Sequence, residues 1–404
     1  MDKLSHRKAT ARLRLLNPDG TPIVNRPIEI NQLSHKFLFG CGVFEAVDMF
    51  RAETDEQREL LSQLLDKWLG LFNFGTLPFY WGRYEREPGR TEEEPTLKAA
   101  KWLREHGVTL KGHPLCWHTA CANWLMQYNN DEILRRQIER IHRDMTAFKG
   151  VIDMWDVINE VVIMPDFDKY DNAITRICKE KGRISLVKEV FAAAKESNPS
   201  ATLLINDFNT SVAYEILIEG LLEAGVPISV IGIQSHQHQG YWGREKLENV
   251  LERYSRFGLP IHFTENTLIS GELMPGHIVD LNDFQVSEWP STEEGEARQA
   301  REITEMYSIL FNHPSVEAIT TWDFADDTWL HAPAGFVRID NTEKPAYHAL
   351  HSLIHGEWET HEKLVTDNEG YLTFTGFKGG YTLKTDGKEV PFELTEDIGK
   401  TLRI

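Results

Sequence analysis

The strongest constraint on the fold of this chain is an alternation of short apolar segments with longer segments of helical periodicity. Eight apolar segments fit buried β-strands, in the order 37–40, 72–76, 110–113, 154–159, 203–206, 230–234, 261–265 and 319–322. Eight helical segments follow them, near 54–68, 96–106, 131–149, 184–197, 211–224, 245–257, 292–311 and 345–355. Such an alternation predicts an α/β fold, the (β/α)8 TIM barrel.

Local signals support the helix boundaries. Thr54 and Gln57 form a capping-box pattern at the start of the first helical segment. Gly107, Gly150 and Gly258 follow three other helical segments, at positions where helices commonly end. A doubly wound open sheet is the alternative arrangement of these elements, but no Gly-x-Gly-x-x-Gly turn follows the first strand. The sequence therefore favours the barrel.

The two ends of the chain have a different pattern. Residues 9–32 alternate apolar with polar side chains and are broken by an Asn-Pro-Asp-Gly turn signal at 17–20. After the last helical segment, glycine-rich turns separate more short alternating runs. Neither end could bury enough apolar surface by itself. We therefore expect a small all-β appendage, a β-sandwich built from residues 1–35 and 356–404, beside a barrel of residues 36–355.

The charge of the chain limits its partners. The formal net charge is −19, from 43 Lys and Arg against 62 Asp and Glu, and no basic run interrupts it. A nucleic-acid partner or an anionic membrane surface is therefore not expected. The chain has no apolar stretch of membrane-spanning length and does not begin with a signal-peptide pattern. We expect a cytoplasmic protein, although a secreted chain with its leader removed would begin in the same way. The sequence does not indicate an oligomeric state.

The cysteines are too few for a disulfide scaffold in a chain of 404 residues, and their spacing matches no zinc motif. They are Cys41, Cys116, Cys121 and Cys178. We expect reduced, buried thiols, with a Cys116–Cys121 bridge as the alternative.

Two carboxylates stand at the ends of predicted strands on different sides of the barrel. The fourth strand ends in Asn159 and Glu160, and the seventh ends in Glu265. Active sites of (β/α)8 barrels lie at the carboxyl ends of the strands, so Glu160 and Glu265 can face each other across a cleft. Cleavage of a glycosidic bond uses such a pair. One carboxylic acid protonates the leaving oxygen, and one carboxylate attacks the anomeric carbon or activates water.

The other strand ends carry side chains of the kinds that bind sugars. Indole rings stack on the apolar face of a pyranose, while amides and imidazoles hydrogen-bond its hydroxyl groups. The candidates are His113, Trp117, Gln234, His236, Trp322 and Trp329. Eleven Trp, eleven Tyr and twenty Phe are consistent with a sugar-binding cleft, although most aromatic residues of any protein belong to its core.

A metal centre is the alternative use of the histidines. His113, His118, His236, His238 and Glu265 are distributed over strand ends as in a barrel metallohydrolase. Such a centre usually has a His-x-His on its first strand, whereas the first strand here offers Phe-Gly-Cys-Gly. We therefore expect neither a metal nor another cofactor.

Read in chain order, the strand ends resemble glycoside hydrolase family 10, the endo-β-1,4-xylanase family. The matching motifs are Gly-His-Pro-Leu-Cys-Trp-His at 112–118, Trp-Asp-Val-Ile-Asn-Glu at 155–160, Asn-Asp-Phe-Asn at 206–209, Gly-Ile-Gln-Ser-His at 232–236, Thr-Glu at 264–265, Trp322 with Asp326 and Trp329, and Lys-Pro-Ala-Tyr at 344–347. The resemblance covers residues 39–353 and implies a retaining hydrolase on a (β/α)8 barrel.

The resemblance also implies a role for each matching residue. Glu160 would be the general acid/base and Glu265 the nucleophile, which requires a raised pKa for Glu160 and an ionised Glu265. Asn159 would hold the sugar 2-hydroxyl, and His236 would hydrogen-bond the nucleophile. The remaining substrate contacts would come from His113, Trp117 and Gln234 around the same sugar, and from Trp322 and Trp329 along the glycone side.

Two departures from the family pattern concern substrate choice and the nucleophile. Members of the family usually carry Glu-Asn-Glu-Met-Lys-Trp on the second strand, and its Asn and Lys hold the second glycone sugar. This chain has Leu-Pro-Phe-Tyr-Trp at 77–81, with Lys111 on the next strand as an alternative source of a lysine. The usual Thr-Glu-x-Asp has become Thr-Glu-Asn-Thr at 264–267, so the carboxylate partner of His236 is missing.

We therefore expect a retaining β-glycosidase that takes an oligosaccharide or glycoside substrate. The leading substrates are xylo-oligosaccharides or short glycosides with β-1,4-xylosidic bonds, and long xylan is expected to be a poor substrate. A β-glycosidase for another glycan or a small plant glycoside is the alternative within this class. A carbohydrate-binding protein is the alternative outside it, and it is disfavoured because a binder does not need two catalytic carboxylates.

Overall fold

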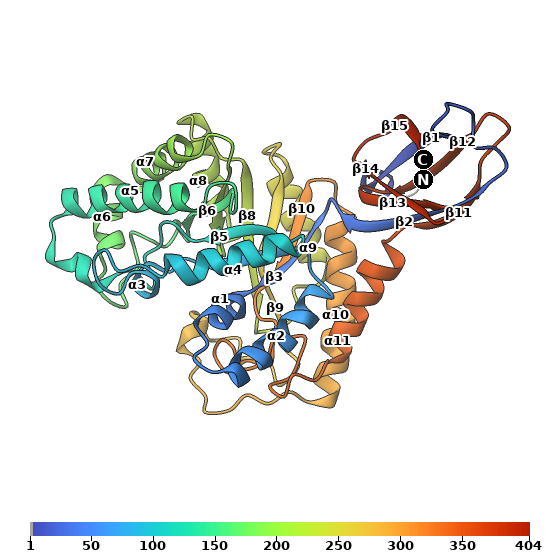
Figure 1. Cartoon of the computed structure of the whole chain (residues 1–404). Helices are drawn as coiled ribbons and strands as arrows, with labels where there is room; N and C mark the ends of the chain where they lie inside the picture. Colours follow the sequence, from blue (N-terminus) through green and yellow to red (C-terminus); the bar gives the residue numbers. More distant parts are fainter. Residues whose placement is uncertain (1–2) are drawn as a thin grey trace. The chain divides into compact units, whose positions relative to one another are not determined.

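The computed structural model describes residues 3–404, which form two compact units (Figure 1). One unit runs to Leu38 and resumes at His348–Ile404, and the other is Phe39–Tyr347.

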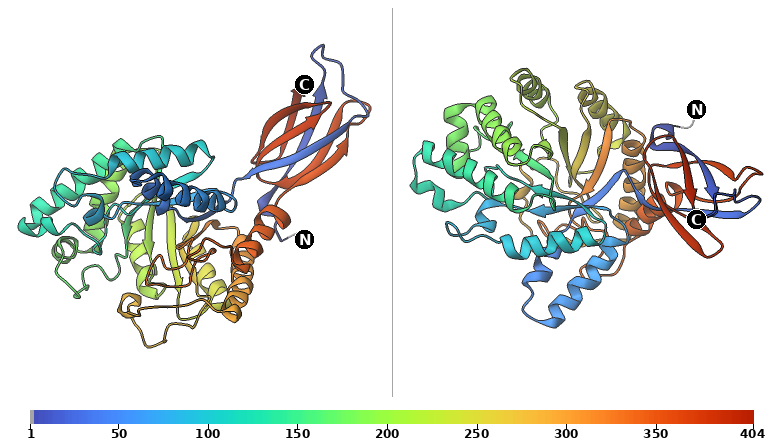
Figure 2. Two further views of the ribbon diagram at one scale, coloured as in Figure 1. Left: turned by 60° about the horizontal axis from the view of Figure 1, so that its bottom comes forward. Right: turned by 45° about the horizontal axis from the view of Figure 1, so that its top comes forward.

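The larger unit is a closed barrel of eight strands in the order β10-β3-β4-β5-β6-β7-β8-β9, so neighbours in the barrel are also neighbours in the chain. Helices surround the strands in every view of this unit (Figures 1 and 2). The strands are β3 (Leu38–Gly42), β4 (Phe74–Pro78), β5 (Thr109–His113), β6 (Met154–Asn159), β7 (Thr202–Asp207), β8 (Val230–Gln237), β9 (Ile261–Leu268) and β10 (Val316–Thr321). The predicted (β/α)8 TIM barrel is confirmed.

Eleven α-helices lie within the described residues, and none of them is long and apolar enough to cross a membrane. They are α1 (Phe44–Arg51), α2 (Asp55–Leu69), α3 (Trp81–Tyr84), α4 (Glu93–Glu105), α5 (Asn130–Ala147), α6 (Ala173–Lys181), α7 (Arg183–Ser197), α8 (Val212–Glu223), α9 (Gly243–Ser255), α10 (Glu293–Phe311) and α11 (Pro345–Ser352). Short helical turns are η1 (Ser5–Arg7), η2 (Asn123–Gln127), η3 (Leu281–Asp283) and η4 (Leu353–Glu357).

The capping signals lie where the sequence predicted them. The Thr54 side chain accepts a hydrogen bond of 3.2 Å from the Gln57 N–H and so caps α2. Gly107 and Gly150 follow α4 and α5 with φ of +80° and +82°, a conformation that costs glycine little.

Two features of the barrel differ from the sequence-based expectations. Helices α1, α3 and α6 were not predicted, because each is too short to show a clear helical period. Strand β9 was expected to end at Glu265, but it continues to Leu268 through polar residues. Asn266 can lie inside this strand because its side-chain amide donates to the Thr320 carbonyl at 2.6 Å, which satisfies a buried polar group.

The smaller unit consists of two sheets with strands from both ends of the chain. One sheet has the order β12-β1-β15 and the other β11-β2-β13-β14. The strands are β1 (Lys8–Leu16), β2 (Pro27–His35), β11 (His361–Val365), β12 (Tyr371–Phe377), β13 (Gly379–Thr385), β14 (Lys388–Leu394) and β15 (Ile398–Arg403). β1 pairs with β12 and β15, and β2 pairs with β11 and β13, so each N-terminal strand lies between two C-terminal strands. The predicted all-β appendage built from both termini is confirmed.

A single apolar core fills this unit. It includes Ala11, Leu13, Leu15, Ile28, Ile30, Leu372, Phe374, Tyr381, Leu383 and Leu394. Every second residue of β1 is buried, which is the alternation expected of a strand with one face on a core.

The four cysteines are free thiols, as the sequence predicted, and the alternative Cys116–Cys121 bridge is wrong. Cys41, Cys116 and Cys178 are buried, where burial raises the pKa of each thiol.

Leu13→Ala should lower the free energy of unfolding of the smaller unit by about 2–5 kcal/mol, because it leaves a cavity in a closed core. Leu13 is 0% exposed, whereas Leu33 on β2 is 64% exposed. Leu33→Ala is therefore the matched control and should change stability little. Urea unfolding of both variants measures the difference, and equal losses would contradict this account of the core.

Candidate active site

One candidate catalytic carboxylate directly follows β6 and the other lies inside β9, and β7 and β8 separate these two strands in the barrel. Glu160 directly follows β6 and has a φ of +55°, an uncommon conformation for a residue other than glycine. Its backbone N–H donates to the Asn206 carbonyl at 2.8 Å, which fixes the turn. Glu265 lies within β9 and is 4% exposed.

Three buried amides link the two carboxylates. The Asn206 Nδ2 donates to Glu265 Oε1 at 2.7 Å and to Asn159 Oδ1 at 2.8 Å. The Gln234 Nε2 donates to the same Asn159 oxygen at 3.0 Å and to Glu160 Oε1 at 3.3 Å. A continuous set of hydrogen bonds therefore runs from one acid to the other and holds both in place.

The pKa of Glu160 is raised to about 8, first by burial and then by the negative charge of Glu265. The Trp117 Nε1 donates to Glu160 Oε2 at 2.9 Å and partly opposes this shift. Glu160 therefore carries a proton at neutral pH, as a general acid must.

The pKa of Glu265 is lowered instead. Burial would raise it, but the charge of His113 and the hydrogen bond from His236 outweigh burial. His236 Nε2 lies 3.0 Å from Glu265 Oε2, and His113 Nε2 lies 3.8 Å from Oε1. Two neighbouring carboxyl groups thus have opposite protonation states, the pattern typical of an acid and a nucleophile.

A buried charge pair lies next to this site. Lys111 and Asp156 are both 0% exposed, and their Nζ and Oδ2 atoms are 2.7 Å apart. The same Asp156 oxygen lies 2.7 Å from His113 Nδ1. The suggestion that Lys111 could replace the missing glycone lysine is therefore wrong, because its ammonium group is held inside the barrel by Asp156.

His236 lacks the carboxylate partner that the family pattern would provide. Its Nδ1 is buried and has no hydrogen-bond partner within residues 3–404. Thr267, which stands where the family has Asp, contacts Nδ1 of His238 at 3.2 Å instead. The ring of His236 is therefore held through Nε2 and by its aromatic neighbours.

Those neighbours are the two predicted tryptophans. The Trp322 ring centre lies 5.9 Å from that of His236 and 5.2 Å from that of His113. The Trp329 ring centre lies 4.8 Å from that of His236. Together with the hydrogen bonds above, these contacts bring all nine predicted site residues to one place.

Two further residues contact the site, Asn206 from the Asn-Asp-Phe-Asn motif and Tyr80 from the altered second-strand segment, although neither was assigned a role from the sequence. Asn206 connects the two halves of the amide network, and its position at a strand end was the available signal. Tyr80 follows β4, with its ring centre 5.8 Å from that of His113 and 5.6 Å from that of Trp117. No family motif marked it, because the second strand departs from the family pattern.

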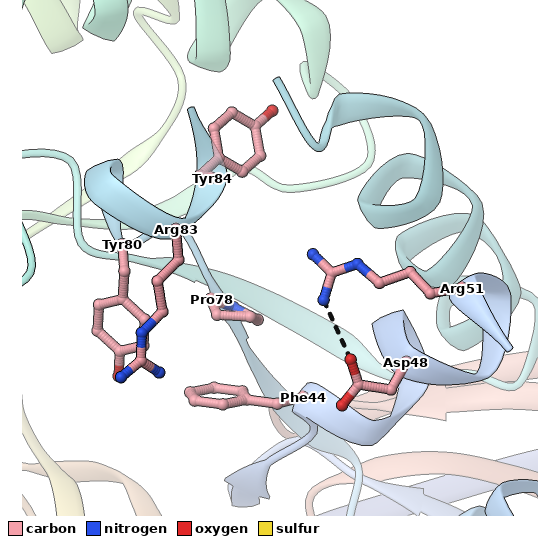
Figure 3. A pocket seen from close by; sticks show the side chains of 7 residues that line it. All are labelled: Phe44, Asp48, Arg51, Pro78, Tyr80, Arg83 and Tyr84. Carbon is pink, nitrogen blue, oxygen red and sulfur yellow. Dashed lines mark hydrogen bonds and ion pairs between the residues drawn. The ribbon is translucent and has the colours of Figure 1, made fainter. Parts of the chain in front are cut away.

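A pocket adjoins the site on the side of β3 and β4 (Figure 3). It is lined by Phe44, Asp48, Arg51, Pro78, Tyr80, Arg83 and Tyr84. Tyr80 and Phe44 connect it to the catalytic residues, since the Phe44 ring centre lies 5.5 Å from that of Trp322.

The β9–α10 loop (residues 269–292) ties several segments together on the side of β7 and β8. Lys169, which follows β6, lies 2.7 Å from Asp280 and 2.6 Å from Asp283 of this loop. Gln239, which follows β8, donates to two carbonyl groups of the loop at 3.0 and 2.7 Å. We call the two ion pairs of Lys169 the latch, because they join the loops that follow the two catalytic strands.

The metal alternative finds no support in the arrangement of the histidines. Within residues 3–404, no group of three or more His, Cys, Asp or Glu side chains is placed to hold a metal ion.

Glu160→Gln should stabilise the protein at high pH. A carboxyl group whose pKa is about 8 in the folded state and about 4.5 in the unfolded state contributes stability that is lost as pH rises between these values. Glutamine does not ionise, so the variant does not lose this stability as pH rises. Compared with the wild-type protein, it should have the higher free energy of unfolding at about pH 9 and nearly the same value at about pH 5. Urea unfolding at both pH values measures it, with the exposed Glu252→Gln as control; a pH-independent difference would contradict the raised pKa.

The first curated relative, the endo-1,4-beta-xylanase/feruloyl esterase of Xylanibacter ruminicola, is 26% identical over 272 residues, which are 57% of this chain and 34% of that protein. The beta-1,4-xylanase of Dictyoglomus thermophilum is 30% identical over 250 residues, 59% of this chain and 66% of that protein. The chain thus covers less than two thirds of the length of either relative.

Among solved structures, xylanase 10B from Thermotoga petrophila in complex with xylobiose superposes with a TM-score of 0.64 at 21% identity, over 80% of this chain and 95% of that one. At this identity the likeness concerns the fold. The sequence profile of glycosyl hydrolase family 10 matches residues 79–353, which is more than half of the chain. The chain therefore belongs to glycosyl hydrolase family 10.

Proposed function

We propose that the chain is a retaining β-glycosidase that works by double displacement. The observation that carries this proposal is the pair of linked carboxyl groups with opposite pKa shifts, Glu160 raised to about 8 and Glu265 lowered. A glycosidase of this kind needs one protonated and one ionised carboxyl group at neutral pH. Membership of glycosyl hydrolase family 10 supports the same assignment.

In this mechanism Glu265 attacks the anomeric carbon while Glu160 gives its proton to the leaving oxygen. The bond from carbon to the leaving oxygen breaks, and a covalent glycosyl–Glu265 ester forms. Glu160, now ionised, then takes a proton from a water molecule that attacks the same carbon and releases Glu265. Asn159 would bind the sugar 2-hydroxyl, and His236 would keep Glu265 oriented through Nε2.

We infer that β-1,4-xylosidic bonds are the leading substrate, because curated relatives of the matched region are named as xylanases. We further infer a preference for xylo-oligosaccharides or short glycosides. Tyr80, an aromatic residue beside Trp117 and His113, stands in the segment where the family carries its glycone Asn and Lys. The latch joins the loops after β6 and β9, and we infer that a long leaving chain would contact it.

Glu265→Ala should abolish turnover, and Glu160→Gln should lower kcat/KM on an unactivated xylobioside by about 10²–10⁴-fold, the usual contribution of general acid catalysis. On an aryl glycoside with a good leaving group, the leaving oxygen needs less protonation. Glu160→Gln should therefore lower kcat/KM less on that substrate. For the wild-type protein, kcat/KM should fall as pH rises through about 8, since Glu160 then loses its proton. Glu252→Gln serves as the control. A wild-type protein that binds sugars but hydrolyses none of a broad aryl-glycoside panel would be a carbohydrate-binding protein.

The first product should have the β configuration of the substrate, which NMR can follow during the reaction. Retention requires carboxyl groups about 5–5.5 Å apart, against about 6.5–9.5 Å for inversion. An α-configured first product would overturn the double-displacement mechanism.

The chain should hydrolyse xylobiosides with a higher kcat/KM than polymeric xylan. Loss of an amide and a lysine at the second glycone sugar removes hydrogen bonds of which the charged one alone is worth about 10- to 150-fold. Lys169→Met, which opens the latch, should raise the polymer-to-xylobioside ratio by up to about fivefold, the range of an exposed ion pair. Lys188→Met, on an exposed helix position, is the control. Faster hydrolysis of xylan than of xylobiosides by the wild-type protein would refute this preference.

A further inference from the structure

We propose that the pocket beside Tyr80 is a binding subsite for a carboxylate-bearing sugar, a uronosyl residue joined to the sugar that is cleaved. This inference rests on the proposed glycosidase function and specifies the substrate class of the same site. It concerns the lining residues Phe44, Asp48, Arg51, Tyr80 and Arg83 (Figure 3).

The pocket is placed to receive the sugar that follows the reacting one. Tyr80 belongs to both sites, because its ring lies 5.8 Å from His113 beside the nucleophile and also lines the pocket. Phe44 packs edge-on against Tyr80 and Trp322, at 5.9 and 5.5 Å between ring centres. These aromatic rings form a continuous surface from the catalytic centre into the pocket, and such surfaces suit the apolar faces of consecutive pyranose rings.

Arg83 supplies a cation that no acidic side chain neutralises. Its guanidinium lies over the Tyr80 ring, 5.5 Å from the ring centre, and it forms no ion pair with any residue in 3–404. The residue is exposed, so an incoming ligand can reach it. A planar guanidinium with several parallel N–H groups is the natural partner of a carboxylate.

The second arginine of the pocket is fixed in place. Arg51 donates to Asp48 and to Glu92, both at 3.0 Å, and Figure 3 shows its guanidinium directed into the pocket from the side opposite Arg83. Arg51 is therefore neutralised by Asp48 and Glu92, and Arg83 is the lining cation that has no acidic partner within residues 3–404, in a chain of net charge −19.

Asp48 indicates which anion the pocket prefers. Its carboxylate can accept hydrogen bonds from sugar hydroxyl groups, but it would repel a second negative charge. A uronosyl carboxylate carries one negative charge and a phosphate monoester carries up to two at neutral pH. The uronosyl residue therefore fits the pocket better than a 6-phosphorylated sugar.

The test uses three aryl disaccharides that differ only at C5 of the terminal sugar. They are the 4-nitrophenyl β-xylosides that carry a β-1,4-linked glucuronosyl, glucosyl or 6-phosphoglucosyl residue. We expect the wild-type protein to have its highest kcat/KM on the glucuronosyl compound, and added salt should reduce this preference.

Arg83→Gln should lower the glucuronosyl-to-glucosyl ratio of kcat/KM by about tenfold, the lower end of what a hydrogen bond to a charged group is worth, because Arg83 is exposed. Arg83→Lys keeps the positive charge but loses the planar guanidinium. Its glucuronosyl-to-glucosyl ratio should therefore lie between that of the wild-type protein and that of Arg83→Gln. Arg86→Gln removes an exposed arginine three residues away that does not line the pocket, and should leave the ratio unchanged.

The outcomes separate this inference from the proposed function. A wild-type ratio of one or below, a ratio unaffected by Arg83→Gln, or a preference for the phosphorylated compound would overturn the uronosyl subsite while leaving the glycosidase intact. If no glycoside is cleaved, the proposed function fails, and calorimetric titration with the same compounds decides the subsite. Tighter binding of the glucuronosyl compound that Arg83→Gln abolishes would support it, and equal binding of all three would refute it.

Discussion

The ionised state of Glu265 is the condition on which the rest of the site depends, and a line of buried charges maintains it. Lys111 pairs with Asp156, Asp156 contacts Nδ1 of His113, and His113 Nε2 lies 3.8 Å from Glu265. Alone, any of these charges would be costly to bury, and each is stabilised by the next. Burial is the largest cause of the raised pKa of Glu160, and the negative charge that this line holds on Glu265 raises it further. The protonation states of the two acids are therefore coupled.

The barrel makes this arrangement possible because it brings strand ends from distant parts of the chain together. Asn159 and Asn206 are 47 residues apart, and Gln234 and Glu160 are 74 apart, yet they are joined by hydrogen bonds. Parallel strands in consecutive order place the carboxyl end of each next to that of its neighbour. The amide network thus follows from the strand order.

Helices α1 and α3 border the pocket next to the second barrel strand. The second strand lacks the polar residues that the family uses there, and α1 and α3 border the same space with Phe44, Arg51 and Arg83. The latch joins the loops that follow the two catalytic strands. The catalytic centre and its surroundings have therefore diverged to different degrees, since the chemistry of glycoside cleavage leaves little freedom at the centre and much around it.

By itself, the sequence determined the barrel, the β unit and the identity of the two acids, because these depend on periodic burial and on residues at strand ends. Hydrophobic period separates strand from helix locally, and a glutamate after a buried strand is recognisable without coordinates. Short helices such as α1 and α6 were not predicted, because a segment of eight or nine residues hardly shows a helical period. Only the tertiary structure decided that Lys111 is paired inside the barrel, that Tyr80 and Asn206 join the site, and that Lys169 meets Asp280 across more than 100 residues. Such contacts depend on which side chains the closed barrel brings within a few ångströms of each other, and no local pattern in the chain encodes that distance.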